Sequence, residues 1–326
     1  MHRELKILQA NTRKMRWVQH AMYNDGDLDG FDAILFQEPN CYQVDGDVLI
    51  TGAGPKWEVI RPRVWSDRRY PVRSCIWANK HGNFEQIEVE SPDITAIVLS
   101  ASGRQIYLAS VYIPPINTTA ETGERGTRFD EQQLRSRLRL LQNSLDEQKV
   151  RYPSLELFIA GDFNRHDLVW GGEEVGLSPR QGEAQGLLEF VEANDLQLLL
   201  PKGTVTWEGP NATTATIDLA FSSQQLFEDR IRCSVFDNEY GSDHRAIQSS
   251  FGMQSDDEEQ STPTTRYLFR NANWESVRKD ISDITRTTTF PESDIDAMNE
   301  YLSSTVHQAL DKHCPRAKPS TYAKRW

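Results

Sequence analysis

The chain has 326 residues, of which 38% are hydrophobic and 26% are charged, and its formal net charge is −12. This composition is typical of a globular protein, and no apolar run approaches the ~20 residues of a membrane span. The acidic balance excludes a protein that coats nucleic acid through its overall charge. The N-terminus lacks the apolar region of a signal peptide, so we predict a nuclear or cytoplasmic protein that is not secreted and has no membrane partner.

Two apolar stretches near the N-terminus end in polar residues. Residues 5–11 alternate apolar and polar side chains, which predicts a strand that ends at Asn11. A helix is predicted at 15–24, and a second strand at 31–36 stops at a proline directly after Glu38. Glu38 is therefore expected at a strand end.

The middle of the chain is rich in strands, with helices between them. Strands are predicted at 57–60, 74–77, 94–99, 106–113, 155–160, 204–207, 215–221 and 246–251. Helices are predicted at 129–145 and 185–194, and in the first of these leucines recur at three- and four-residue steps. Clustered strands with helices between and after them predict an α/β fold with two packed, mixed or largely antiparallel sheets covered by helices.

An acidic, polar stretch divides the chain. Residues 254–265 contain no large apolar side chain, which is the composition of a flexible linker. We therefore predict a first domain at 1–253, a linker at 254–266 and a short helical segment at 267–326.

A basic cluster follows the predicted strand at 57–60. Guanidinium groups can pair bidentately with phosphates, and the neighbouring Trp65 and Tyr70 offer stacking surfaces, so this cluster suits a substrate-binding loop that faces nucleic acid. The alternative is a solvated turn whose arginines pair with acidic residues elsewhere, and the sequence favours neither. The arginine cluster consists of Arg61, Arg63, Arg68, Arg69 and Arg73.

Four short stretches carry the chemistry. Each apolar run ends in carboxylate, amide or imidazole groups, so buried strands would deliver hard oxygen ligands and one titratable base to the same sheet edge. This layout predicts a divalent-metal phosphodiesterase. The stretches are 35–39, 160–164, 216–219 and 241–245.

Each stretch also has a structural alternative. Glu38 is predicted to bind Mg²⁺, which prefers one or two carboxylates and keeps several waters, although a solvated strand-end acid is the alternative. Asp162 and Asn164 would point the same way on an extended backbone, to activate water and to bind the water or phosphate, whereas an Asx turn is the competing interpretation. Asp243 offers a second carboxylate near the metal.

His244 is the remaining titratable group. Asp218 could orient its imidazole through the second ring nitrogen, which favours either a base or a donor to phosphate. A structural histidine is the alternative, and a catalytic role is favoured only because the other polar stretches are present.

In this order, the stretches resemble the endonuclease/exonuclease/phosphatase superfamily over about residues 5–252. Within it, the chain is most similar to the endonuclease domain of non-LTR (LINE-type) retrotransposons, on 37–39, 161–166, Thr206-Trp207 and 242–244. The phosphoinositide-phosphatase branch would have an Asp-Arg pair where this chain has Asp218-Leu219. The positions that match the family's catalytic set are Asn11, Glu38, Tyr112, Asp162, Asn164, Asp218, Asp243 and His244.

The resemblance implies a fold and an activity. The fold would be a four-layer α/β sandwich with two central mixed or antiparallel sheets. The activity would be Mg²⁺-dependent nicking of one strand of double-stranded DNA, with Mn²⁺ as the alternative ion, to leave a 3′-hydroxyl that primes reverse transcription. The segment after the linker is similar to the part that joins endonuclease to reverse transcriptase, so a reverse transcriptase in the same polyprotein is an expected partner.

The resemblance also implies roles. Glu38 would hold the metal with Asp243 near or on it, and Tyr112 would contact phosphate. Asn11 and Asn164 would position water and phosphate. Either Asp162 or the Asp218–His244 pair could supply the general base. The DNA target sequence would be recognised by Thr206, Trp207, the loop that follows them and the arginine cluster.

Two other functions stay open at this point. One is a phosphatase or phosphodiesterase of the same superfamily that acts on a small phosphorylated substrate. The other is a catalytically silent module that only binds nucleic acid.

Overall fold

The computed structural model describes residues 3–52, 54–65, 69–116, 131–172, 175, 183–253, 268–287 and 295–315. The chain divides into two compact units, Met1–Asp256 and Asp257–Trp326. Arg68 and the predicted linker lie outside the described residues. In the described part of the chain, no helix is both long enough and apolar enough to cross a bilayer.

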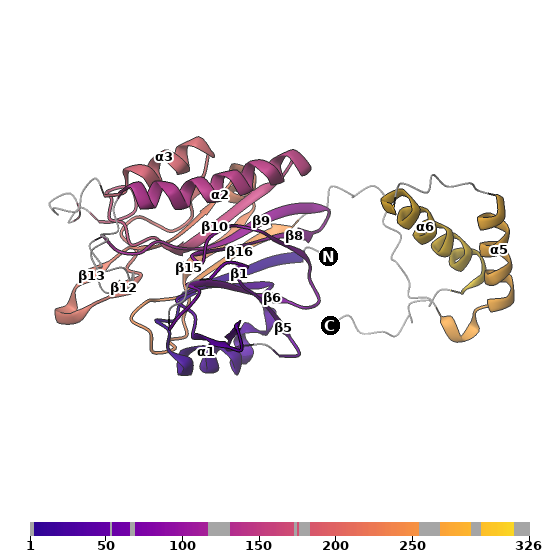
Figure 1. Ribbon diagram of the computed structural model, residues 1–326, viewed down its shortest axis with the longest axis horizontal. Coiled ribbons are helices and arrows are strands. Elements are labelled where there is room, and N and C mark those ends of the chain that lie inside the picture. Colours follow the sequence, from indigo (N-terminus) through magenta and orange to yellow (C-terminus); the bar gives the residue numbers. More distant parts are fainter. Residues whose placement is uncertain are drawn as a thin grey trace. The chain divides into compact units, whose positions relative to one another are not determined.

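Two six-stranded mixed sheets form the centre of the first unit (Figure 1). The first has the order β15 (Arg230–Val235), β16 (Ile247–Met253), β1 (Arg3–Asn11), β2 (Ala33–Gln37), β6 (Ser74–Asn79) and β5 (Trp57–Ile60). The second has the order β11 (Gln197–Leu198), β14 (Asp218–Ser222), β10 (Glu156–Asp162), β9 (Arg104–Tyr112), β8 (Ile94–Ala101) and β7 (Asn83–Ile87). β1 and β2 are parallel, as are β9 and β10, and the other neighbours in these sheets pair antiparallel.

Helices cover the two outer faces. α1 (Arg16–Tyr23) packs on the first sheet, and α2 (Glu131–Arg151) and α3 (Gln185–Ala193) lie over the second (Figure 1). The order of layers is therefore helix, sheet, sheet, helices. The α/β sandwich with two central mixed sheets that the sequence predicted is confirmed.

The alternation of side chains along β1 explains how the layers are filled. Leu5 and Ile7 belong to the core between the sheets, whereas Leu8 and Ala10 face α1 on the other side. Because successive side chains of a strand point to opposite faces, Asn11 follows Leu5 and Ile7 toward the second sheet. One face of β1 therefore carries core residues first and a polar residue, Asn11, at its end.

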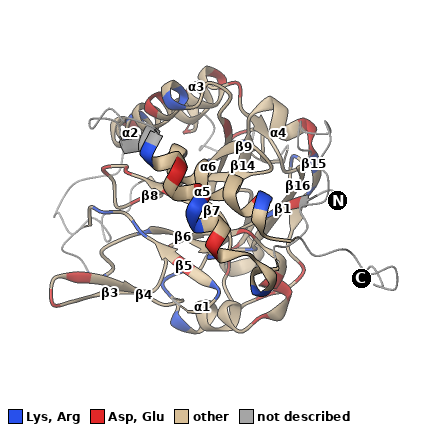
Figure 2. Cartoon of the chain, turned by 90° about the vertical axis from the view of Figure 1, so that its right-hand side faces the viewer, with Lys and Arg blue, Asp and Glu red and all other residues tan. Residues whose placement is uncertain are grey.

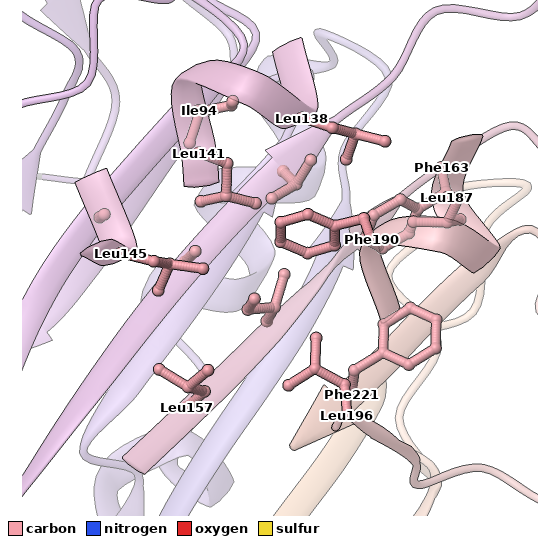
Figure 3. Close-up of a cluster of buried hydrophobic side chains, with 14 of the residues drawn as sticks. Ile94, Leu138, Leu141, Leu145, Leu157, Phe163, Leu187, Phe190, Leu196 and Phe221 are labelled. Carbon is pink, nitrogen blue, oxygen red and sulfur yellow. The ribbon is translucent and has the colours of Figure 1, made fainter. Parts of the chain in front are cut away.

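The outer core of the second sheet is built on α2 (Figure 3). Leu134, Leu138, Leu141 and Leu145 are buried at three- and four-residue steps. Burying each leucine contributes roughly 1.5–3 kcal/mol, so packing of this face, more than intrinsic propensity, stabilises the helix.

Several short elements were not predicted from the sequence. β3 (Cys41–Val44) and β4 (Asp47–Ile50) form a hairpin whose acidic tip is red in Figure 2. Asp45 and Gly46 have positive φ angles of 50° and 83°, as a tight hairpin turn requires. The others include β7, β11, β15, η1 (Gly26–Gly30) and α4 (Gln224–Glu228). In place of the strand predicted at 204–207, the structure has a hairpin of β12 (Trp207–Glu208) and β13 (Thr214–Ala215) with η3 (Pro210–Ala212) at its tip.

The second unit contains η4 (Phe269–Asn271), α5 (Trp274–Thr287) and α6 (Ile295–His313). Val277 and Ala309 are buried between the helices, and Asp280 of α5 accepts from Lys312 and lies 2.8 Å from Nε2 of His313. Both basic and acidic residues lie along α5 (Figure 2).

Candidate active site

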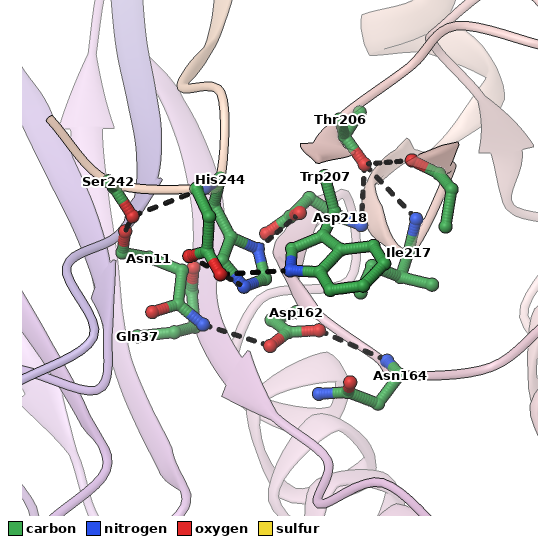
Figure 4. A network of polar contacts seen from close by, with 12 residues as sticks. Asn11, Gln37, Asp162, Asn164, Thr206, Trp207, Ile217, Asp218, Ser242 and His244 are labelled. Carbon is green, nitrogen blue, oxygen red and sulfur yellow. Dashed lines mark hydrogen bonds and ion pairs between the residues drawn. The ribbon is translucent and has the colours of Figure 1, made fainter. Parts of the chain in front are cut away.

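Strand register brings the candidate residues to one end of both sheets. Asn11 pairs with Gln37 across parallel β1 and β2, so Glu38 follows at the same edge. On the second sheet, Asp162 lies opposite both Tyr112 and Asp218. The two edges meet where the Asn11 Nδ2 donates to Asp162 Oδ2 at 2.9 Å (Figure 4).

His244 and Asp218 form a buried pair in this site (Figure 4). His244 Nδ1 lies 2.8 Å from Asp218 Oδ2, and the other carboxylate oxygen accepts from Gln9 Nε2 at 2.9 Å. Thr206 Oγ1 accepts the backbone N–H of Asp218 at 3.0 Å. Hydrogen bonds on each side of Asp218 therefore fix the carboxylate that orients the imidazole.

The charges of the site shift two pKa values. Burial alone would lower the pKa of His244, but the carboxylates of Asp218, Asp162 and Asp243 outweigh it and raise this pKa to about 9. Burial, followed by the negative charges of Asp218 and Glu38, raises the pKa of Asp162 well above that of an ordinary aspartate, although His244 and the Asn11 hydrogen bond oppose the shift. The imidazole is therefore charged at neutral pH.

Glu38 and Asp243 are the carboxylates that fit a divalent metal. Among the described residues, the buried Oδ1 of Asp243 accepts no hydrogen bond, whereas the buried Oε1 of Glu38 is held by a cation. Glu38 Oε1 instead lies 2.7 Å from the ammonium of Lys14, and Asp243 Oδ2 lies 3.0 Å from Arg13 Nη1. Two carboxylates suit a Mg²⁺ ion, because it keeps several of its waters and needs few protein ligands.

A second group of possible ligands lies deeper. Ligand atoms of Asp162, Asp218 and His244 all lie within 4.8 Å of one another. Both oxygens of Asp162 already accept hydrogen bonds, from Asn11 and from the backbone of Asn164, and both oxygens of Asp218 are also engaged. The hydrogen-bonding of this deeper group suits proton transfer better than metal binding.

Asn164 and Tyr112 flank Asp162. Asn164 has a left-handed φ of 49°, and its N–H donates to Asp162 Oδ1 at 3.1 Å. The argument from spacing assumed an extended backbone at this position, and the structure contradicts it. The observed contact is the Asx turn that was the competing interpretation. The Asn164 amide donates to the carbonyl of Ile113 at 3.0 Å, and the buried Tyr112 ring lies under the Arg73 guanidinium at 5.1 Å.

Trp207 and Ser242 hold the loop that carries Asp243 and His244. Trp207 Nε1 donates to Asp243 Oδ2 at 3.2 Å, and Trp207 also forms a β-bridge with His244. Ser242 Oγ donates to the Asn11 carbonyl at 2.8 Å. Beside this loop, a cavity of about 410 Å³ is lined by Asn11, His244 and residues of α1.

Three members of the arginine cluster pair with acidic residues. Arg61 pairs with Asp47, and Arg63 lies 3.2 Å from Glu88. Arg73 is buried and donates through two nitrogens to Asp93. Arg69 stacks on the Tyr70 ring at 5.4 Å. Arg73 thus supports the wall of the site, while Arg63 is exposed to solvent.

Sequence reasoning did not identify three side chains that act on the site: Gln9, Arg13 and Lys14. The signal for Gln9 was present, since it lies two residues before Asn11 and therefore on the same face of the strand. No pattern in the sequence showed that Arg13 and Lys14 would meet acidic residues from distant segments.

The comparisons with known proteins identify relatives of the part of the chain that carries this site. Residues 106–248 match a family model described as endonuclease-reverse transcriptase. The segment carries the signature of the endonuclease/exonuclease/phosphatase superfamily. The predicted resemblance to this superfamily, and within it to non-LTR retrotransposon endonucleases, is confirmed, and it supports a hydrolytic enzyme.

Solved structures show the same fold. The endonuclease domain of TRAS1, a telomere-specific non-LTR retrotransposon, has a TM-score of 0.59 and 15% identity, over 77% of this chain and 99% of that one. AP endonuclease LMAP from Leishmania major has a TM-score of 0.56 and 15% identity, over 77% and 89%. The 3′-5′ exonuclease NExo from Neisseria meningitidis has the same TM-score and identity, 0.56 and 15%, over 76% and 100%. No curated protein matches the chain.

Proposed function

We propose that the chain is a metal-dependent endonuclease that nicks one strand of double-stranded DNA by phosphodiester hydrolysis and leaves a 3′-hydroxyl. The observation that carries this proposal is the convergence of Glu38, Asp243, Asp162 and the Asp218–His244 pair at one edge of the sandwich. The similar solved structures include an AP endonuclease and the 3′ phosphatase NExo bound to a product DNA hairpin, which supports DNA as the substrate.

The two proton transfers of the reaction are assigned to different side chains of the protein. His244 is charged at neutral pH and therefore acts as a donor to the scissile phosphate rather than as a base. Asp162 is then the group that takes a proton from water, because its raised pKa makes its ionised form a stronger base than an ordinary aspartate. Asn11 fixes the Asp162 carboxylate, and Asp218 fixes the imidazole.

Glu38 and Asp243 would hold Mg²⁺ or Mn²⁺. Such an ion supplies charge to stabilise the anionic transition state and the leaving oxygen. Tyr112 lies opposite Asp162 and would contact a phosphate oxygen.

The hairpin of β12 and β13 would meet the DNA beside the scissile bond. It projects from the sandwich (Figure 1), and at its tip Asn211 and Ala212 have positive φ angles of 58° and 57°. Trp207 at its base bonds to Asp243, so the hairpin is coupled to the site. A reverse transcriptase in the same polyprotein would use the new 3′-hydroxyl as a primer.

The test is the conversion of supercoiled plasmid to open circles with Mg²⁺. Asp162→Ala and His244→Ala should each abolish nicking, whereas Asp146→Ala on α2 and His81→Ala at an exposed turn should nick like the parent. Equal nicking by all five proteins would contradict the proposal. Release of inorganic phosphate from inositol phosphates without plasmid relaxation would instead indicate a phosphatase.

A further inference from the structure

Two consecutive cations each pair with one of the two carboxylates that fit a metal. Arg13 Nη1 is 3.0 Å from Asp243 Oδ2, and Lys14 Nζ is 2.7 Å from Glu38 Oε1. Glu38 follows β2 and Asp243 precedes β16, so the two pairs connect the loop after β1 to two different segments of the chain. One dipeptide therefore neutralises both carboxylates.

The backbone of this dipeptide is strained, and its conformation directs the two side chains to Asp243 and Glu38. Arg13 and Lys14 have left-handed φ angles of 49° and 62°, and such a conformation costs a residue other than glycine on the order of 1–3 kcal/mol. The loop is fastened to the site, because the Lys14 N–H donates to the Glu38 carbonyl at 2.7 Å and the Arg13 N–H donates to Asn11 Oδ1 at 2.9 Å.

The two cations differ in their surroundings. The Lys14 and Glu38 side chains are only 19% and 12% exposed, and the Lys14 ammonium also lies 5.6 Å above the Tyr70 ring. An ion pair with so little solvent around it is screened less than a surface pair. Arg13 is 52% exposed, so its guanidinium can also reach a ligand in solvent.

We propose that Arg13 and Lys14 are positioning residues that exchange partners. They neutralise Asp243 and Glu38 until a divalent cation binds these carboxylates, and they then turn to phosphate oxygens of the substrate. This inference rests on the proposed function. A carboxylate oxygen held by an ammonium must give up that contact to bind a metal strongly, and a released guanidinium or ammonium is a good partner for a phosphate.

The first test measures Mn²⁺ binding by calorimetry. Lys14→Met should bind Mn²⁺ on the order of tenfold more tightly than the parent, because the metal no longer competes with the ammonium. Lys14→Arg keeps the charge and should bind Mn²⁺ like the parent. The matched control is Lys6→Met, which removes an exposed lysine that lies 3.3 Å from Glu4 on β1.

The second test uses unfolding and DNA binding. In EDTA, Lys14→Met should melt below the parent, and Mn²⁺ should restore its melting temperature. In an Asp162→Asn background, Arg13→Met should weaken binding of a short DNA duplex severalfold with Mn²⁺ present and have little effect in EDTA.

The outcomes separate this inference from the proposed function. If the parent binds Mn²⁺ but Lys14→Met has unchanged affinity and a melting loss that Mn²⁺ does not restore, Lys14 is only structural and the exchange is wrong. The milder Lys14→Gln provides the same comparison if Lys14→Met does not fold. A parent that binds no Mn²⁺ would remove both the proposed metal site and the exchange.

Discussion

His244 Nδ1 lies 2.8 Å from Asp218 Oδ2, and both side chains are buried. The two residues come from different elements, the loop before β16 and the start of β14. The contact fixes the orientation of the ring and supplies the negative charge that keeps it protonated. It leaves Nε2 as the ring nitrogen that can face the scissile phosphate.

Asp218→Asn should lower nicking by roughly 10²-fold or more and move the alkaline limit of activity to lower pH. The variant keeps the shape of the side chain but removes the charge that raises the pKa of His244, so the donor is lost at a lower pH. The measurement is a pH–rate profile of plasmid nicking. Asp229→Asn, which alters a partner of Arg104 outside the catalytic set, is the control and should keep the parent profile. An unchanged alkaline limit in Asp218→Asn would argue against His244 as the donor.

His244 should also make stability depend on pH. Its pKa is about 9 in the folded protein and about 6.5 in the unfolded chain, so folding favours the protonated form. The stabilisation is fully present below pH 6.5 and is lost as the pH rises through about 9. Melting temperatures of the parent and of His244→Gln, measured from pH 6 to pH 10, should converge at the alkaline end. A constant difference over this range would contradict the assignment.

Gln9→Leu should lower kcat for nicking about tenfold with little change in KM. Gln9 Nε2 donates to Asp218 Oδ1 at 2.9 Å and lies 2.6 Å from Gln37 Oε1, so its loss frees the carboxylate that orients the imidazole. Leaving a buried acceptor unsatisfied should also cost roughly 1–3 kcal/mol of stability. Gln86→Leu on β7 is the control for a glutamine in a strand. A loss of stability at unchanged kcat would make Gln9 structural only.

Arg73→Ala and Arg63→Ala should separate structure from substrate binding in the arginine cluster. Arg73 and Arg137 both pair with the buried Asp93, so removal of Arg73 leaves this charge only partly compensated and should cost about 1.5–3 kcal/mol in chemical denaturation. Arg63 is exposed, and Arg63→Ala should leave stability nearly unchanged but weaken DNA binding and reduce its salt dependence by about one phosphate contact. If Arg63→Ala binds DNA like the parent at every salt concentration, this arginine is a surface residue without a role in binding.

The sequence was sufficient to predict the main strands and the ends at which the polar residues lie. Hydrophobic alternation identified β1 and the leucine period identified α2, because both follow from the geometry of a single element. Short elements such as the β3–β4 hairpin were missed, since four-residue strands carry little periodicity. The left-handed backbone at Asn164 was anticipated only as the Asx-turn alternative, because residue spacing does not distinguish an extended strand end from a local turn.

The sequence predicted those residues of the candidate site that lie at the ends of strands. The contacts that Gln9 and Lys14 add to the site were not predictable, because they depend on how the sheets and loops pack together. Gln9 meets Asp218 across the two sheets, and Lys14 meets Glu38 through a strained loop. Such contacts join residues far apart in the sequence, and no local pattern encodes them.

The position of a bound Mn²⁺ ion tests the central claim most directly. Anomalous diffraction from crystals soaked in Mn²⁺ should place the ion on oxygens of Glu38 and Asp243, with Lys14 no longer on Glu38. An ion held instead by Asp162, Asp218 and His244, or no ion at this edge of the sandwich, would contradict the account.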